Sequence, residues 1–417
     1  MHISRIELTN FRNHHHLVLE DIGGVLIIVG NNAVGKTNII EALQLISMHE
    51  SFRKPKPEEL VYRERAEGAP TLIKVVIQTL ESENTKQLAL SCNGKTFSYN
   101  KKERPARELA GLLPAVLFTP DDLQIVKGPP EQRRDLLDSL GARLSKSFAQ
   151  IRAEYYKTLR HKNSLLRQEE RDTGLLDSWN VNLAKLGTSL QKHRKGLFEK
   201  LFVNATEAYG TLSGGEELSG AYISSWEAEQ PEGERVQAAQ DTDATRDTSA
   251  ALYEALLQNQ EAELRARRSL VGPHRDDVSF CINGQDTRRF ASQGQQRSIA
   301  LALKMAEIEV LRRVSGKDPL LLLDDVMSEL DAARRSYFVE LIKEASQTVL
   351  TTTNLGYFDA AFLERATVVE LEGTASGEGP NALPPTEQAP SPESGVATSG
   401  HLLQKDPSEH SARDDGP

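Results

Sequence analysis

Gly30-Asn31-Asn32-Ala33-Val34-Gly35-Lys36-Thr37 lies between an apolar run at residues 25–29 and a helical pattern at residues 39–46. A strand, a glycine loop ending in Lys-Thr, and a helix are the context that a phosphate-binding P-loop requires. Glycine lets the backbone turn tightly, so that N–H groups and the helix N-terminus point at phosphates. We expect all eight residues to surround the phosphates, with Lys36 supplying a positive charge and Thr37 a hydroxyl to Mg²⁺. The chain is therefore predicted to bind ATP with Mg²⁺.

A second element of such a site is the run Leu320-Leu-Leu-Leu-Asp324-Asp325. Four apolar residues and two carboxylates predict a buried Walker B strand, and ligands bind at the carboxyl end of strands in an open parallel sheet. We expect Asp324 to hold Mg²⁺ and Asp325 to polarise the attacking water. Lys36 and Asp325 are thus the predicted catalytic residues. The alternative is a buried strand that ends in turn-forming aspartates.

The segment Ser292-Gln-Gly-Gln-Gln-Arg297 opens a predicted helix shortly before the Walker B strand. This is the place and the form of an ABC signature motif, in which a hydroxyl, a glycine and a helix N-terminus face an anion. In ABC-class proteins that anion is the γ-phosphate bound by the opposing subunit. Ser292, Gly294 and Gln295 are therefore predicted nucleotide contacts across an ATP-dependent homodimer. The alternative is an ordinary N-cap serine.

A similar spelling occurs at Leu212-Ser-Gly-Gly-Glu216. It precedes the Walker B strand by far too many residues, and a strand-like segment at residues 221–224 follows it in place of an amphipathic helix. We expect a turn at this position.

The net charge of −10 is unevenly distributed. Residues 227–250 and 373–417 each carry net −5, so the remainder is neutral, and residues 131–200 carry net +6. A basic face for the phosphate backbone of DNA is compatible with this distribution. No apolar run approaches a membrane span, and the two cysteines lack metal-ligand spacing. We expect a soluble cytoplasmic protein.

Hydrophobic periodicity changes along the chain from mixed strands and helices to a helical pattern at residues 131–209, and then returns. We predict an α/β fold with an inserted, mainly helical second lobe. We expect four divisions: 1–118, the first part of an ATPase lobe with Walker A; 119–268, a helical lobe with an acidic insertion at 227–250; 269–372, the second part of the ATPase lobe with the signature and Walker B; and 373–417, a disordered tail.

Six motifs occur in order along the chain. They are Asn10-Phe-Arg-Asn13; the P-loop with Asn38 and Glu41-Ala42; Phe118-Thr-Pro-Asp-Asp-Leu123 with Val126-Lys-Gly128; Gly272-Pro-His-Arg-Asp-Asp277; Ser292-Gln-Gly-Gln-Gln-Arg297; and Leu321-Leu-Leu-Asp-Asp-Val326 with Ser328-Glu-Leu-Asp331. Over residues 1–371, this series resembles the RecF family of bacterial DNA replication and repair ATPases.

The resemblance implies an ABC/SMC-type ATPase head that dimerises with ATP on gapped or single-stranded/duplex DNA. It also implies weak, DNA-stimulated ATP hydrolysis, partners of the RecO and RecR type, and a role in loading recombinase after DNA damage. By analogy with related heads, Arg12 is expected to reach the nucleotide phosphates. For His274 and Arg275, a role beside the site and a role in holding the two lobes together both stay open.

Two departures from the usual pattern stand out. Position 33 is alanine where such loops usually have glycine, which restricts the loop locally without blocking phosphate binding. Residues 351–354 contain no histidine of the transporter kind, and together with an aspartate at position 325 in place of a transporter's glutamate, this favours slow switching. Two alternatives to a DNA-repair ATPase stay open: an ATP-binding scaffold without significant turnover, and the ATPase subunit of a transporter.

Overall fold

The computed structural model describes residues 2–79, 82–91, 94–109, 111–168, 173–226 and 248–372. The predicted tail at 373–417 lies outside the described residues. So does the predicted acidic insertion, except that residues 248–250 begin a helix. None of the helices in the described part of the chain is long and apolar enough to cross a membrane.

A five-stranded, all-parallel sheet carries the P-loop. Its strand order is β14 (Ala366–Glu370), β3 (Val25–Val29), β13 (Thr348–Thr352), β12 (Leu320–Asp324) and β8 (Ala115–Phe118). The strands predicted at residues 25–29 and 320–324 are confirmed as β3 and β12. Parallel strands all end at the same edge of the sheet. The P-loop follows β3 and the two aspartates lie at the end of β12, so both are found at that edge.

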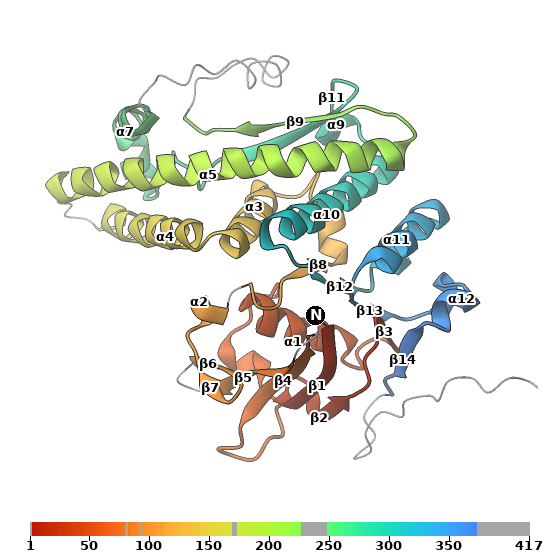
Figure 1. The fold of residues 1–417 in the computed structure, drawn as a ribbon. Helices are drawn as coiled ribbons and strands as arrows, with labels where there is room; N and C mark the ends of the chain where they lie inside the picture. The colour runs from red at the N-terminus through yellow and green to blue at the C-terminus, as the bar shows by residue number, and fades with distance from the viewer. Residues whose placement is uncertain are drawn as a thin grey trace, which may run out of the picture. The chain divides into compact units, whose positions relative to one another are not determined.

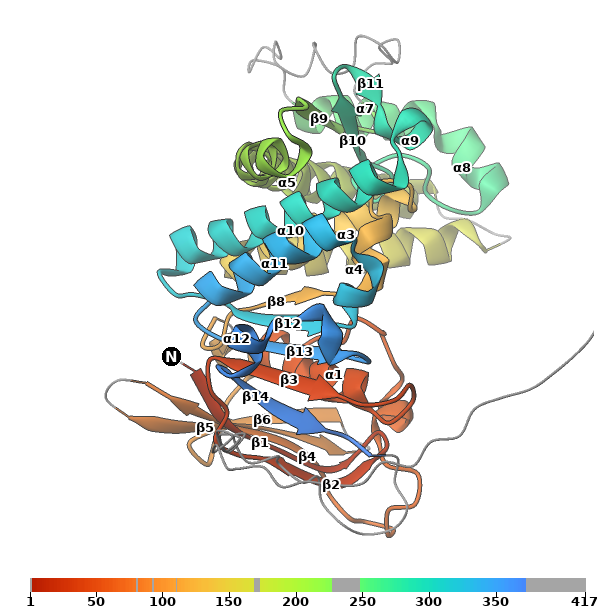
Figure 2. The same cartoon turned by 90° about the vertical axis from the view of Figure 1, so that its right-hand side faces the viewer.

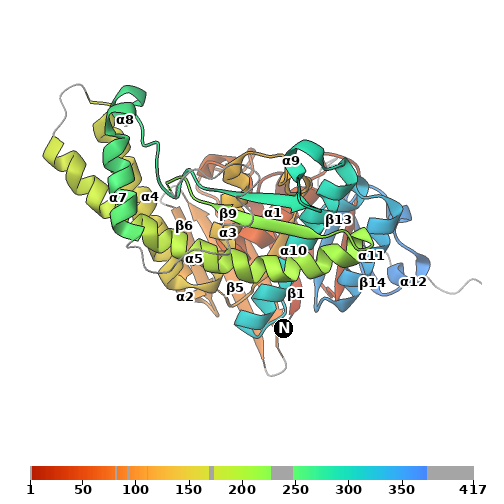
Figure 3. The same cartoon turned by 90° about the horizontal axis from the view of Figure 1, so that it is seen from above.

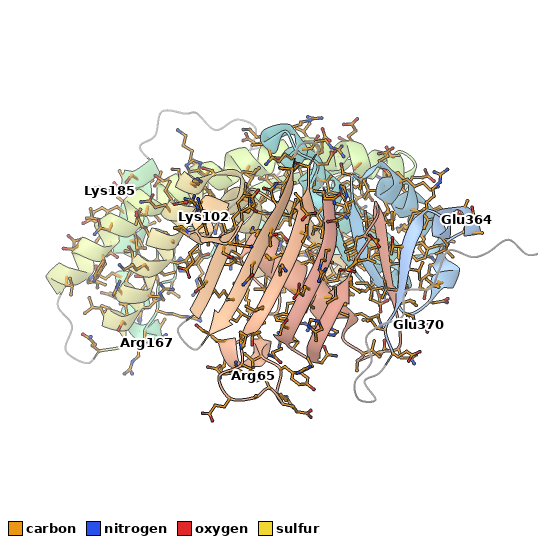
Figure 4. All side chains as sticks on the ribbon, turned by 60° about the horizontal axis from the view of Figure 1, so that its bottom comes forward. Arg65, Lys102, Arg167, Lys185, Glu364 and Glu370 are labelled. Carbon is orange, nitrogen blue, oxygen red and sulfur yellow. The ribbon has the colours of Figure 1, made fainter. Side chains whose placement is uncertain are left out.

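An antiparallel sheet forms a second layer. It runs in the order β2 (His14–Leu19), β1 (His2–Phe11), β4 (Thr71–Gln78), β5 (Glu83–Ser91), β6 (Gly94–Tyr99) and β7 (Lys102–Glu103). Helix α1 (Lys36–Met48) lies between the two sheets, as Figure 2 shows, and its Ile39, Ile40 and Leu43 are fully buried in one hydrophobic cluster with residues of both. Figure 4 looks onto the antiparallel sheet, with Lys102 at one edge and Arg65 in a loop at its end. Burial on both sides fixes the P-loop helix in place.

Helices cover the other face of the parallel sheet. They include α10 (Gln293–Ser315) and α11 (Ala332–Glu344), which share a second hydrophobic cluster with β8 and β12. Short elements complete this region: α2 (Ala106–Leu109), α12 (Ala360–Leu363), and the 3-10 turns η1 (Pro57–Leu60), η2 (Pro120–Gln124), η3 (Val326–Glu329) and η4 (Leu355–Tyr357).

The helical pattern at 131–209 forms three helices, α3 (Pro130–Leu144), α4 (Lys146–Leu166) and α5 (Thr173–Ser213). Helix α5 is 41 residues long and packs along α4 and α10, which Figure 1 shows from the side. The hydrophobic pattern at residues 252–268 predicts a single helix, and this prediction is wrong in one respect, because the helix breaks at Asn259 into α7 (Thr248–Gln258) and α8 (Gln260–Ala266). Figure 3 shows α7 against α5.

A small antiparallel sheet accompanies these helices. It contains β11 (Gln285–Asp286), β10 (Asp277–Ile282) and β9 (Leu218–Ile223), followed by α9 (Thr287–Phe290). The inserted region is thus mainly helical with one sheet. Its exact boundaries at residues 118 and 268 stay predictions.

Candidate nucleotide site

The eight predicted loop residues are continuous with β3 and α1: residues 30–35 connect the two elements, and Lys36 and Thr37 begin α1. Gly35 caps α1 with φ 105°, and a Cβ there would come within 2.5 Å of the Asn13 side chain and 2.8 Å of His14 Nε2. A Cβ on Gly30 would lie 2.5 Å from the carbonyl oxygen of Leu371. Both positions therefore require glycine, one for its backbone conformation and both for close approach.

Ala33 adopts φ 69°, in the left-handed region that favours glycine. For an L-residue with a Cβ this conformation costs roughly 1–2 kcal/mol. The alanine at this position therefore leaves the P-loop shape intact at a local energetic cost.

Lys36 lies along the loop that precedes it. Its Nζ donates to the carbonyl oxygens of Gly30 at 2.6 Å and of Asn31 at 2.8 Å. Burial lowers the pKa of Lys36, while the negative charges of Asp325 and Asp324 oppose that shift. The ammonium is thus held over the loop, close to two carboxylates.

Asp324 joins the loop to two strands of the sheet. The hydroxyls of Thr37 and Thr351 donate to its Oδ1 at 2.8 and 2.9 Å. Carboxylate and hydroxyl oxygens are the ligands that Mg²⁺ prefers, usually alongside waters and phosphate oxygens. Thr37 and Asp324 therefore fit a magnesium site, and Thr351 orients the carboxylate from behind.

Asp325 takes a left-handed backbone conformation, φ 50°, directly after the strand. Its N–H donates to the Thr351 hydroxyl at 3.0 Å. Burial, Asp324 and Glu329 raise the pKa of Asp325, and Lys36 partly offsets them. Its Oδ1 is buried without a hydrogen-bond partner among the described residues. A buried carboxylate with one free oxygen and a raised pKa is suited to accept a proton.

Arg12 lies in the turn between β1 and β2. Its Nε and one terminal nitrogen donate to the fully buried carboxylate of Glu41 on α1, at 2.9 and 2.7 Å. The other terminal nitrogen donates to the carbonyl oxygen of Glu59 at 2.6 Å. The structure thus pairs Arg12 with the P-loop helix, and its predicted phosphate contact stays a prediction.

The next two residues of that turn were not expected to have a role. The Asn13 amide donates to the carbonyl oxygen of Val34 at 3.0 Å and accepts from the Asn38 amide at 2.7 Å. His14 Nε2 lies 3.2 Å from the carbonyl oxygen of Gly35, and burial lowers the pKa of His14. A neutral imidazole therefore donates to the loop. The sequence signal for them was the first motif, which contains Asn13 beside Arg12 and is followed directly by His14.

The predicted signature residues lie at the start of α10. Ser292 is the N-cap, and its side chain and that of Gln295 form a reciprocal capping box. Gly294 faces Arg334, whose terminal nitrogen would lie 3.1 Å from a Cβ at that position. Within the ranges that the structure describes, no hydrogen bond or ion pair joins Ser292, Gly294 or Gln295 to the P-loop. The structure thus brings together the Walker residues and leaves the signature apart from them.

The look-alike motif at 212–216 is a turn, as predicted. Helix α5 ends at Ser213, and Gly214 and Gly215 follow with φ 72° and 107°. Its last residue nevertheless contacts the signature, because Glu216 accepts a hydrogen bond from the Gln295 amide at 2.8 Å. His274 and Arg275 lie elsewhere, against α4 and the segment after α8.

A P-loop after one parallel strand, paired carboxylates after a nearby strand and a serine-capped helix on the far face define an ABC/SMC-type ATPase head. A family model described as the RecF/RecN/SMC N terminal domain matches residues 2–375. Curated relatives and solved structures cover most of the same length. By these matches, the chain belongs to the RecF family of DNA replication and repair proteins.

Two of these relatives are DNA replication and repair proteins RecF from Cyanothece sp. and Gloeobacter violaceus. Each is 36% identical; the alignments cover 89% and 91% of this chain and 97% and 99% of the relatives. Two solved structures are of the recombination mediator protein RecF of the RecFOR pathway, described with ATPrS and with ATP. They are 30% and 31% identical with TM-scores of 0.78 and 0.75, covering 89% and 88% of this chain and 96% and 95% of theirs.

Proposed function

We propose that this chain is an ATP-dependent DNA-binding protein of recombinational repair and replication-fork maintenance. ATP with Mg²⁺ brings two copies together on gapped or single-stranded/duplex DNA, where they help to load recombinase with RecO- and RecR-type proteins in the cytoplasm. Slow ATP hydrolysis then releases the DNA. Family membership, the ATP named in one related structure and the ATPrS named in another support this proposal.

The proposal of an ATP-dependent dimer rests on one observation. Ser292 is exposed at the N-terminus of a 23-residue helix, and no described contact links it to the P-loop of its own chain. A helix N-terminus with unsatisfied N–H groups favours an anion. The γ-phosphate held by a second copy is the partner that the signature pattern implies.

In the proposed dimer, the edge of the parallel sheet of one chain supplies one half of each nucleotide site. The signature helix of the other copy supplies the second half. Lys36 faces the β- and γ-phosphates, Thr37 and Asp324 hold Mg²⁺, and Asp325 takes the proton from the attacking water. Bound Mg²⁺ supplies charge neutralisation for the phosphates. Position 325 is an aspartate, whose side chain is shorter than the glutamate of a transporter ATPase, and residues 351–354 contain no histidine. Both features support slow turnover.

DNA binding draws support from the charge of the helical region. Arg167, at the end of α4, and Lys185, on α5, are exposed and are labelled on these helices in Figure 4. Exposed basic side chains attract the phosphate backbone without regard to sequence.

The test is the oligomeric state by light scattering, with ATP and Mg²⁺. Wild type is expected to dimerise, and Ser292→Arg to remain monomeric because the large cation blocks the helix N-terminus. Ser178→Arg, on an exposed face of α5, is the matched control and should dimerise like wild type. A wild type that stays monomeric, or a Ser292→Arg variant that dimerises normally, contradicts the composite site.

A further inference from the structure

Three arginines that have no acidic partner among the described residues gather beside the Gly272–Asp277 motif. Arg134 is on α3, Arg268 follows α8, and Arg275 belongs to the motif itself. No described carboxylate lies within ion-pair distance of any of them, whereas neighbouring arginines are paired. The paired set is Arg133 with Asp277, Arg152 with Asp138, and Arg194 with Asp138.

Two of the three arginines are held by contacts that do not neutralise them. Arg134 donates to the carbonyl oxygen of Asp276 at 2.7 Å, and Arg275 to that of Ser269 at 3.0 Å. Burial lowers the pKa of Arg275, and the positive charges of Arg268 and Arg134 lower it further. Arg275 is therefore close enough to the other two guanidinium groups to be repelled by them.

The acidic groups nearby are already engaged. Glu263 is 1% exposed and binds Lys162 Nζ at 2.6 Å, the Ser269 hydroxyl at 2.8 Å and the Leu270 N–H at 2.9 Å. Asp276 is also buried, and it accepts from the Tyr222 hydroxyl at 2.6 Å. Neither carboxylate is free to pair with the arginines.

His274 gives the loop a rigid, neutral support. Its Nε2 lies 3.3 Å from the carbonyl oxygen of Ser269, so Nε2 carries the hydrogen and Nδ1 accepts from Tyr155 at 2.8 Å. Burial and the surrounding cations lower the pKa of His274 to about 3. Gly272 has φ 127°, and a Cβ there would lie 2.7 Å from the Tyr155 hydroxyl. The motif thus fixes the loop that carries Arg275.

We propose that Arg134, Arg268 and Arg275 form a binding site for the phosphate backbone of DNA. Arg268 and Arg275 are exposed and Arg134 is partly so, which gives an open surface suited to an extended polyanion. Guanidinium groups bind phosphate through paired N–H donors, and bonds to backbone carbonyl oxygens hold Arg134 and Arg275 in place before the ligand arrives. This inference rests on the proposed DNA-binding function and assigns it a surface.

The experiment compares Arg268→Gln/Arg275→Gln with a matched pair, Arg312→Gln/Arg313→Gln. The control arginines lie at the end of α10 and are already ion-paired, with Glu309 and, for Arg312, Asp318. Binding of a fluorescent gapped duplex is measured with ATP over a series of salt concentrations. Thermal unfolding and ATP-dependent dimerisation of each variant show whether the fold is kept.

Removing two phosphate contacts should reduce the salt slope of log K by roughly 1.8 and weaken binding about tenfold or more near 0.1 M salt. The control pair should match wild type, and Arg275→Gln alone should give about half of the slope change. A well-folded double variant with the wild-type slope overturns the DNA site but leaves the proposed function standing. A wild type that binds no DNA contradicts the proposed function itself.

Polyglutamate of matched charge is the second probe. It should compete poorly with DNA for wild type, because its carboxylates are not held in the rigid, closely spaced row that the phosphates of a duplex form. Competition as strong as that of unlabelled duplex, lost in Arg268→Gln/Arg275→Gln, would assign the site to an acidic protein and overturn the proposal.

Discussion

The hydroxyl of Thr37 donates a 2.8 Å hydrogen bond to Oδ1 of Asp324, 287 residues later in the chain. Thr351 donates to the same oxygen at 2.9 Å, so one carboxylate joins the P-loop helix to two strands. This arrangement orients both expected Mg²⁺ ligands before the ion binds.

Asp324→Asn should abolish the part of ATP affinity that depends on Mg²⁺, because an amide is a poorer ligand for this hard cation than a carboxylate. Titration of a fluorescent ATP analogue, with Mg²⁺ and with EDTA, measures it. EDTA should weaken binding to wild type and to Asp177→Asn, an exposed control with the same charge change. Equal sensitivity of Asp324→Asn to EDTA would exclude Asp324 as a ligand.

As the pH is lowered, the rate of ATP hydrolysis should begin to fall at a higher pH than it would if the base were an aspartate with an ordinary pKa. Burial, Asp324 and Glu329 raise the pKa of Asp325, so this carboxylate is protonated, and cannot accept a second proton, at higher pH than usual. Glu329→Gln removes one negative charge and should move the acid limb of the rate profile to lower pH. A profile that does not move would remove Asp325 from the role of base.

Asp325→Asn should lower the hydrolysis rate by about 10²–10⁴-fold, the usual range for a general base, while ATP-dependent dimerisation persists. Single-turnover hydrolysis and light scattering measure the two effects. DNA release that proceeds unchanged in this variant would favour the alternative of an ATP-binding scaffold.

Two substitutions test the backbone conformation of the P-loop, one through nucleotide affinity and the other through stability. Gly35→Ala forces φ 105° on alanine and places a methyl against Asn13 and His14, so nucleotide affinity should drop by on the order of tenfold or more. Ala33→Gly relieves φ 69° at an exposed position, and stability should rise by up to about 1 kcal/mol. Nucleotide titration measures the effect of Gly35→Ala, and urea unfolding measures that of Ala33→Gly. A less stable Ala33→Gly variant would show that the backbone at Ala33 is not strained.

Arg194→Leu should destabilise the fold by about 3 kcal/mol, because among the described residues the buried carboxylate of Asp138 then keeps only the partly exposed Arg152 as an ionic partner. Arg194 and Asp138 are both 0% exposed and are joined by bonds of 2.7 and 2.8 Å. Urea unfolding measures the loss, with Arg313→Ala at an exposed ion pair as the control, where about 1 kcal/mol or less is expected. An equal loss of unfolding free energy in the two variants would show that the buried Asp138 does not depend on Arg194.

The nucleotide residues were predictable because each belongs to a short local pattern. The apolar run before Gly30 gives β3, the run before Asp324 gives β12, and Ser292 caps α10 where the sequence changes to a helical period. The break at Asn259 was not predictable, because the hydrophobic spacing continues across it.

By itself, the sequence determined the local chemistry of this protein: a P-loop, two carboxylates after a strand, and a capped signature helix. Such features depend on a few neighbouring residues, whose backbone preferences and hydrophobic period are fixed locally. Only the tertiary structure decided which distant groups meet. It pairs Arg12 with Glu41, places Asn13 and His14 under the loop, and sets Thr351 behind Asp324. Those contacts follow from how sheets and helices pack across hundreds of residues, and no local pattern encodes them.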